Sequence, residues 1–149
     1  MPIIGVTRFE RLFRVAAGLH VDKNDLKRYN EFLDRKVYDL FVVAKAAAKA
    51  NGRDVIEPQD LPITKGIQEC TREFRKLDEE LEVVPLLEQL LAWPPLDIAI
   101  SERTEARLPE VVGGLSIALG RAFTVVHPHL KNPGSAEWEQ VFGLFDLLL

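Results

Sequence analysis

The chain has little sulfur, with one cysteine, Cys70, and one methionine among 149 residues. A single cysteine excludes an internal disulfide, so a reducing, cytoplasmic location is expected. These scarcities, together with the many charged residues, also favour a thermophilic source. No uninterrupted apolar run approaches the roughly 18 residues of a membrane span, so none is expected. Near the N-terminus, Arg8 and Arg11 come too early for the core of a signal peptide.

Basic residues are scarce in one half of the chain only. Residues 1–76 carry 15 Lys and Arg against 11 Asp and Glu, a net charge of +4. Residues 77–149 carry 4 against 12, a net charge of −8, so the whole chain carries −4. A protein that coats DNA by charge alone is expected to be basic throughout. Only the first half of this chain fits that description.

What the chain has in quantity is apolar residues at helical spacing. Hydrophobic residues make up 47% of the sequence and charged residues 28%, which is the balance of a folded domain. One apolar stripe covers residues 6–17, and a much longer one runs without Pro or Gly over residues 25–51. Gly52 stops this long helix, and Pro58 suits the first turn of a third helix over residues 58–77.

The second half repeats this order of elements. Residues 82–93 form a short apolar pattern typical of a helix. Ser101 can then cap a long helix that runs to about Val126. After a loop, Ser135 can cap a last helix that continues to the chain end.

The two halves align without gaps when one is shifted by 77 residues, which places Leu40 on Ile117. The apolar stripe of each long helix is too long for its own two short partners to cover. Two such units with their long helices crossed would cover each other. We therefore expect an all-α protein that forms one compact domain over residues 1–149, built from residues 6–76 and 77–149.

The loop after the first long helix contains an isolated β-branched pair, Val55 and Ile56. Two residues are too few for a sheet of their own. We expect them to pair as a very short parallel strand with the first loop of the other half, near Ile98, because this pairing satisfies their backbone groups.

These features resemble the histone fold, above all in the segment AKANGRDVIEPQDL. Archaeal-type histones end their long helix with Gly-Arg, place a β-branched pair in the following loop and open the last helix with an acidic pair. Here those positions are Gly52-Arg53, Val55-Ile56 and Gln59-Asp60. The match covers about residues 7–69, and the second half matches mainly by order and length. The whole chain is similar to small bacterial single-chain histone-fold doublets of unknown function, which implies two tandem histone folds packed as an intramolecular pseudodimer.

The resemblance also implies a structural clamp. In the family, the loop arginine and the helix-opening aspartate form an internal ion pair, which corresponds here to Arg53 and Asp60. The second half has Leu130 and Glu137 at these positions, so its clamp is lost.

Histones hold DNA through phosphate contacts and inserted arginines, without reading bases. The resemblance carries four candidate DNA contacts over to this chain: Arg11, Arg14, His20 and Arg53. The matching positions of the second half hold Glu88, Leu91, Asp97 and Leu130. A carboxylate facing a phosphate repels it, so histone-style wrapping of DNA is not expected. Weak DNA contact through the basic first half stays open, and the alternative is that these charges are ordinary solvated side chains.

No group of side chains in the sequence supports catalysis. His127 and His129 lack the third ligand that catalytic zinc needs, and a plain loop is expected there. The spacing of Cys70 predicts a core position rather than a nucleophile. Gly113-Gly114 indicates a close helix crossing at the centre of the second long helix. We therefore expect a non-enzymatic protein without a metal or cofactor.

The chain end, EQVFGLFDLLL, holds more apolar residues than one narrow helical stripe can accommodate. This surplus predicts an interface with a second copy of the chain or with a protein partner, unless the first half covers all of it. The favoured function is a protein-interaction or assembly module that has lost histone-like DNA wrapping. The alternative is a nucleoid-associated DNA-binding protein that uses the basic first half.

Overall fold

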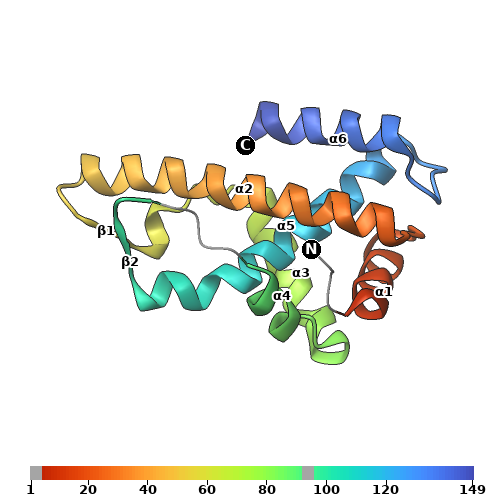
Figure 1. The fold of residues 1–149 in the computed structure, drawn as a ribbon, viewed down its shortest axis with the longest axis horizontal. Helices are drawn as coiled ribbons and strands as arrows, with labels where there is room; N and C mark the ends of the chain where they lie inside the picture. Colours follow the sequence, from red (N-terminus) through yellow and green to blue (C-terminus); the bar gives the residue numbers. More distant parts are fainter. Residues whose placement is uncertain (1–4, 92–95) are drawn as a thin grey trace.

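The computed structural model describes residues 5–91 and 96–149, and most of them are α-helical (Figure 1). The helices are α1 (Val6–Ala17), α2 (Lys23–Ala50), α3 (Lys65–Leu81), α4 (Val84–Leu90), α5 (Glu102–Val126) and α6 (Ser135–Leu148). The connections hold two short strands, β1 (Val55–Ile56) and β2 (Ala99–Ile100), and a 3-10 turn, η1 (Pro58–Asp60). The all-α class predicted from helical spacing is confirmed.

The long helix α2 has well-defined ends. The Asp25 amide donates to the Asp22 side chain at 2.8 Å, and the Asp22 amide donates to the Asp25 side chain at 3.0 Å, so the two aspartates form a capping box. At the other end, Gly52 adopts a left-handed φ of 70°, which an L side chain would strain. The chain therefore leaves the helix where the sequence predicted.

The third helix begins later than predicted. Pro58 opens only the short turn η1, and α3 starts at Lys65. Pro62 has no amide hydrogen and holds the preceding Leu61 in an extended conformation with ψ 129°, so a helix cannot continue through it. The Thr64 side chain then caps α3. The sequence interpretation was wrong here because it overlooked this second proline.

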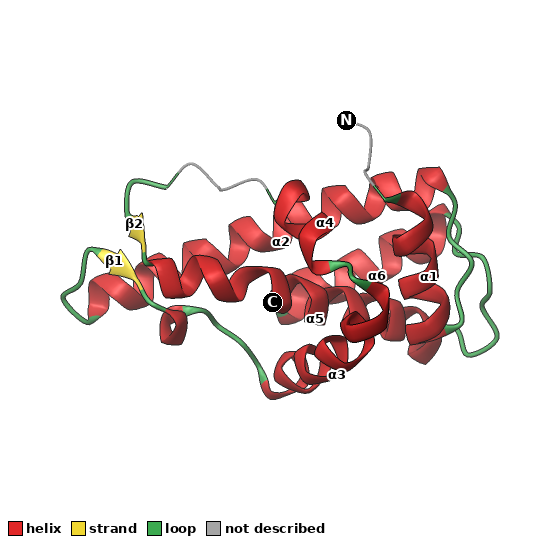
Figure 2. Ribbon diagram, turned by 90° about the horizontal axis from the view of Figure 1, so that it is seen from below, coloured by secondary structure: helices red, strands yellow, loops and turns green. Residues whose placement is uncertain are grey.

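The loops of the two halves meet at both ends of the molecule. β1 and β2 pair in parallel, with Val55 opposite Ala99 and Ile56 opposite Ile100, which confirms the predicted pairing. At the α1 end, the His20 amide donates to the Lys131 carbonyl at 2.7 Å. Figures 1 and 2 show the strand pair and α1 at opposite ends of the long axis.

The apolar stripe of α2 packs against α5 and α6, which are helices of the second half. The hydroxyl groups of Tyr29 and Ser116 lie 2.6 Å apart, which joins α2 to α5. Phe32 on α2 stacks on Phe142 of α6, with ring centroids 5.5 Å apart. Three polar contacts join α2 to α6: Arg28 to Ser135 at 2.8 Å, Lys36 to Asp146 at 2.6 Å and the Trp138 indole to Asp25 at 2.8 Å.

The glycine pair in α5 lets α3 approach it very closely. A Cβ at Gly113 would lie 2.3 Å from the Phe74 ring, and one at Gly114 would lie 2.9 Å from the backbone of Thr71. The close crossing predicted at these glycines is therefore present. Its partner is α3, a short helix from the first half.

By length and composition alone, α5 is the one helix within residues 5–91 and 96–149 that could cross a membrane. Such a result is weak evidence, since the core helix of a folded protein passes the same test. Here 61% of the apolar window lies buried inside the protein. The absence of a membrane span stays a prediction.

Candidate functional site

The candidate DNA contacts on α1 lie on its solvent face. Phe9, Leu12 and Phe13 are buried, whereas Arg11 and Arg14 are exposed. Neither guanidinium has a hydrogen bond or ion pair to any residue that the structure describes. Both charges are therefore available to an anion in solution.

The exposed His20 lies at the same end of the molecule, in the loop that is hydrogen-bonded to Lys131. The side chain of Lys131 is also exposed. This end thus combines cations of α1 with a cation from the second half.

Arg53 does not join this group, because it lies beside β1 at the other end of the molecule (Figure 1). Its two terminal nitrogens donate to the two carboxylate oxygens of Asp60 at 2.6 and 2.7 Å. It also donates to the Val55 carbonyl at 3.2 Å. Asp60 is 5% exposed, and the Arg53 guanidinium holds the pKa of its carboxyl below the ordinary value. Arg53 is thus engaged in a charged bidentate pair that fixes the loop onto η1.

Three further cations near the β1–β2 end are also paired with carboxylates. The pairs are Lys45 with Asp97, Lys49 with Asp54 at 2.9 Å, and Arg103 with Glu57 at 2.9 Å. The hydrogen bond from Lys45 lowers the pKa of Asp97, so that carboxyl stays ionised. Each carboxylate offsets the charge of its cation, which weakens the attraction of these cations for DNA phosphates.

The predicted partner surface on the last helix divides into a covered and an exposed part. Phe142 and Phe145 pack against Phe32 of α2. Leu147 and Leu148 are instead 81% and 73% exposed. The first half therefore does not cover the whole apolar surplus.

An apolar groove of 520 Å³ opens beside these leucines, between the start of α3, the end of α5 and α6. The residues lining it are Thr64, Gly66, Ile67, Cys70, Ala118, Arg121, Ala122, Val125, Leu144, Phe145, Leu148 and Leu149. Val125 on its edge is 79% exposed. We call this groove, together with Leu147, the α5–α6 face.

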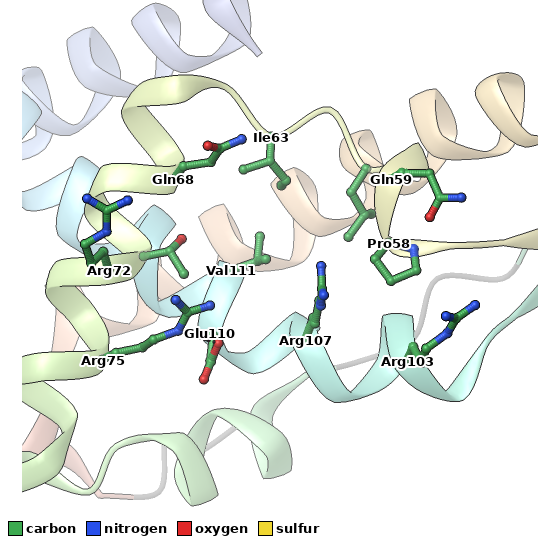
Figure 3. A pocket seen from close by; sticks show the side chains of 12 residues that line it. Pro58, Gln59, Ile63, Gln68, Arg72, Arg75, Arg103, Arg107, Glu110 and Val111 are labelled. Atoms are coloured by element: carbon green, nitrogen blue, oxygen red, sulfur yellow. Dashed lines mark hydrogen bonds and ion pairs between the residues drawn. The ribbon is translucent and has the colours of Figure 1, made fainter.

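A second groove, of 580 Å³, is lined by four arginines (Figure 3). Arg72 and Arg75 come from α3, and Arg103 and Arg107 from the first half of α5. We call it the arginine groove. The other residues lining it are Pro58, Gln59, Leu61, Ile63, Gln68, Thr71, Glu110 and Val111.

Sequence reasoning missed the arginine groove. Its only signal was the spacing of the arginines, three apart on α3 and four apart on α5, which places each pair on one helix face. Such spacing is ordinary for a solvated face. Only the packing of α3 against α5 brings the two faces together.

The side chains considered as a nucleophile and as metal ligands are Cys70, His127 and His129. Cys70 is buried, and burial raises the pKa of its thiol, which keeps it protonated. His127 donates to the Gln140 side-chain carbonyl at 2.6 Å. Among the described residues, no three His, Cys, Asp or Glu side chains gather as a metal site.

A family model described as "Domain of unknown function (DUF1931)" matches residues 9–146. The chain belongs to this family. The DUF1931 match begins within α1 and ends within α6, so it spans both halves.

Two crystal structures are similar to this DUF1931 protein over nearly its whole length. A protein from Thermus thermophilus is 50% identical, with 99% of each chain covered and a TM-score of 0.86. A protein from Aquifex aeolicus is 22% identical, with both chains fully covered and a TM-score of 0.85. At that identity, the second likeness shows a shared fold alone.

An uncharacterised protein from Aquifex aeolicus (strain VF5) is 27% identical to this DUF1931 chain over 111 residues. The alignment covers 74% of this chain and 65% of that relative. It therefore spans slightly less than two thirds of the relative's length.

Proposed function

We propose that this DUF1931 protein is a single-chain histone-fold pseudodimer that acts as a non-enzymatic assembly module and associates with a second copy of itself through the α5–α6 face. The order of helices in each half supports the histone comparison. So do the contacts between the loops of the two halves at both ends of the molecule. The bidentate pair of Arg53 and Asp60 occupies the positions of the family's clamp.

The exposed leucines of α6 are the observation that carries the assembly role. Leu147 and Leu148 lie in water beside an apolar groove of 520 Å³. Contiguous exposed apolar surface of this kind marks interaction sites. A groove and a projecting apolar edge on the same face can fill each other when two copies meet about a two-fold axis.

The charges around this face also fit a second copy. Lys65 and Glu69 lie on the exposed side of α3, 3.4 Å apart, and Arg121 pairs with Glu73. Of these four residues, Arg121 lines the groove, and the other three adjoin it as sequence neighbours of lining residues or through the ion pair. We call these four residues the rim, which offers two cations and two carboxylates. Two identical rims can exchange partners across a two-fold axis, which favours self-association over a partner of one charge sign.

The carboxylates paired with cations near β1–β2 argue against histone-style wrapping. Wrapping needs a continuous arc of donors for phosphates. Near β1–β2, Lys49 and Arg103 already bind Asp54 and Glu57. One end of that arc is therefore occupied by carboxylates.

Sedimentation velocity over a range of protein concentrations tests the proposal. The wild-type chain, 16.8 kDa as a monomer, is expected to sediment with twice that mass as concentration rises. Leu148→Glu should hold it at the monomer mass, because it places a charge in the interface. Val15→Glu is the matched control, since Val15 is an exposed apolar residue on α1, and it should leave the dimer intact. A wild-type monomer at every concentration, or equal effects of both substitutions, contradicts the proposal.

DNA binding at the α1 end is the second candidate. It is favoured by the exposed, unpaired Arg11 and Arg14, with Lys131 of the second half at the same end. Mobility-shift assays at low and moderate salt separate the two functions. Binding that weakens steeply with salt, and drops when Arg11 and Arg14 are both replaced by Ala, would favour DNA.

A further inference from the structure

The arginine groove serves neither of these roles, since it lies outside both α1 and the α5–α6 face. Two of the four cations of the acidic half, Arg103 and Arg107, line it. Together with Arg72 and Arg75, they gather four positive charges in one groove of a chain whose net charge is −4. Like charges gathered in this way repel each other, and an anionic ligand relieves that repulsion.

We propose that the arginine groove binds a nucleotide that carries two or three phosphates. The volume of 580 Å³ lies within the range of small-molecule sites, roughly 300–1,000 Å³. Guanidinium groups are the side chains best suited to phosphate, because they donate two parallel hydrogen bonds.

The arginines are arranged for more than one phosphate group. Arg72 and Arg75 lie one turn apart on α3, and Arg103 and Arg107 lie one turn apart on α5. Residues at these spacings have Cβ atoms about 5–6 Å apart. Figure 3 shows the α3 pair on one side of the groove and the α5 pair along the other, with Arg107 reaching toward the space between the helices.

Most of the donors in the groove remain available. Arg75 binds Glu110 through its Nε, which leaves both terminal nitrogens, and Arg103 binds Glu57 through one terminal nitrogen. Arg72 and Arg107 have no hydrogen bond or ion pair to any described residue. The two carboxylates thus orient one arginine of each pair and leave the other arginine free for phosphate.

The rest of the lining suits a nucleoside. Leu61, Ile63 and Val111 supply apolar surface, and the amide side chains of Gln59 and Gln68 supply donors and acceptors. A planar base can lie on such a surface and hydrogen-bond at its edge. A bare phosphate chain would use only the arginines.

Isothermal titration calorimetry on the full chain at low salt tests the proposal with ADP, ATP, adenosine and inorganic pyrophosphate. ADP and ATP should bind, pyrophosphate should bind at least about tenfold more weakly than ADP, and adenosine should give no binding. Replacing Arg72 and Arg107 together by Gln should weaken ADP binding about tenfold or more. Replacing Arg11 and Arg14 together by Gln removes the same charge elsewhere and should leave it unchanged.

Several results would overturn the proposal. One is the absence of ADP and ATP binding while the protein is folded, as checked by circular dichroism. Equal affinity for adenosine and ADP, or for pyrophosphate and ADP, would also exclude it. So would unchanged ADP binding in the Arg72→Gln, Arg107→Gln variant. Duplex DNA that binds the wild type but not this variant, without any ADP binding, would make the groove a nucleic-acid contact instead.

Discussion

The hydroxyl groups of Tyr29 and Ser116 lie 2.6 Å apart in a buried contact between α2 and α5. The Ser116 hydroxyl donates to the Val112 carbonyl at 2.8 Å, so Tyr29 is the donor to Ser116. Burial raises the pKa of Tyr29 well above its ordinary value, which keeps this proton in place. One buried hydrogen bond therefore links α2, the long helix of the first half, to α5, the long helix of the second half.

The direction of this hydrogen bond predicts unequal costs for its two partners. Tyr29→Phe removes the donor and leaves Ser116 bonded to Val112, so it should lower the free energy of unfolding by about 1 kcal/mol. Ser116→Ala strands a buried phenolic hydroxyl and should cost about 2–3 kcal/mol. The double variant should cost less than the sum, because no polar group is stranded. Urea unfolding measures all three, and additive costs would contradict the assigned direction.

The crossing of α3 and α5 depends on the absence of a side chain at Gly114. A Cβ there would lie 2.9 Å from the Thr71 backbone, so Gly114→Ala must push the helices apart. We expect a loss of about 1–3 kcal/mol in the free energy of unfolding. Gly143→Ala, on α6 with nothing within 4 Å of the added Cβ, is the control and should be neutral or stabilising by up to about 1 kcal/mol. Equal effects of the two substitutions would argue against a close crossing.

Asp60→Asn should destabilise the protein in a pH-dependent way. The Asp60 carboxyl has a pKa below that of an unfolded chain, so its contribution is complete above about pH 5. The contribution is lost as pH falls through the lowered pKa. We therefore expect the variant to be about 2 kcal/mol less stable at neutral pH, with a gap that narrows below about pH 4.

Asp54→Asn is the control for this measurement. Asp54 pairs with Lys49 on the surface, where an ion pair contributes about 0–1 kcal/mol. Its effect on unfolding should be small at every pH. A gap for Asp60→Asn that stays constant into acid would mean that the charge of Asp60 does not stabilise the fold.

Much of the fold could be predicted because its signals are local. Gly52 ends α2 through a backbone conformation that favours glycine, and Ser101 caps α5 by accepting the Thr104 amide at 3.2 Å. The pairing of Val55 with the second half followed from the need to satisfy backbone groups. The start of α3 was missed although its signal, Pro62, is equally local.

The arginine groove could not be predicted because it depends on tertiary packing. Arg72 and Arg107 are far apart in sequence. Each lies one helical turn from another arginine, and such spacing is ordinary for a solvated helix face. What brings their helices together is the contact of Gly113 and Gly114 with α3. Glycines signal a close approach without naming the partner helix. The exposure of Leu148 could not be predicted either, because it depends on how α2 covers α6.

Native-state hydrogen exchange tests most directly whether the two halves fold as one unit, on which the histone comparison depends. Each long helix is covered partly by the other half, so neither should open while the other stays closed. We predict that the slowest amides of α2 and α5 exchange with the same free energy of opening and the same dependence on denaturant. A distinctly lower opening free energy for α5, with α2 still protected, would contradict this prediction and the pseudodimer with it.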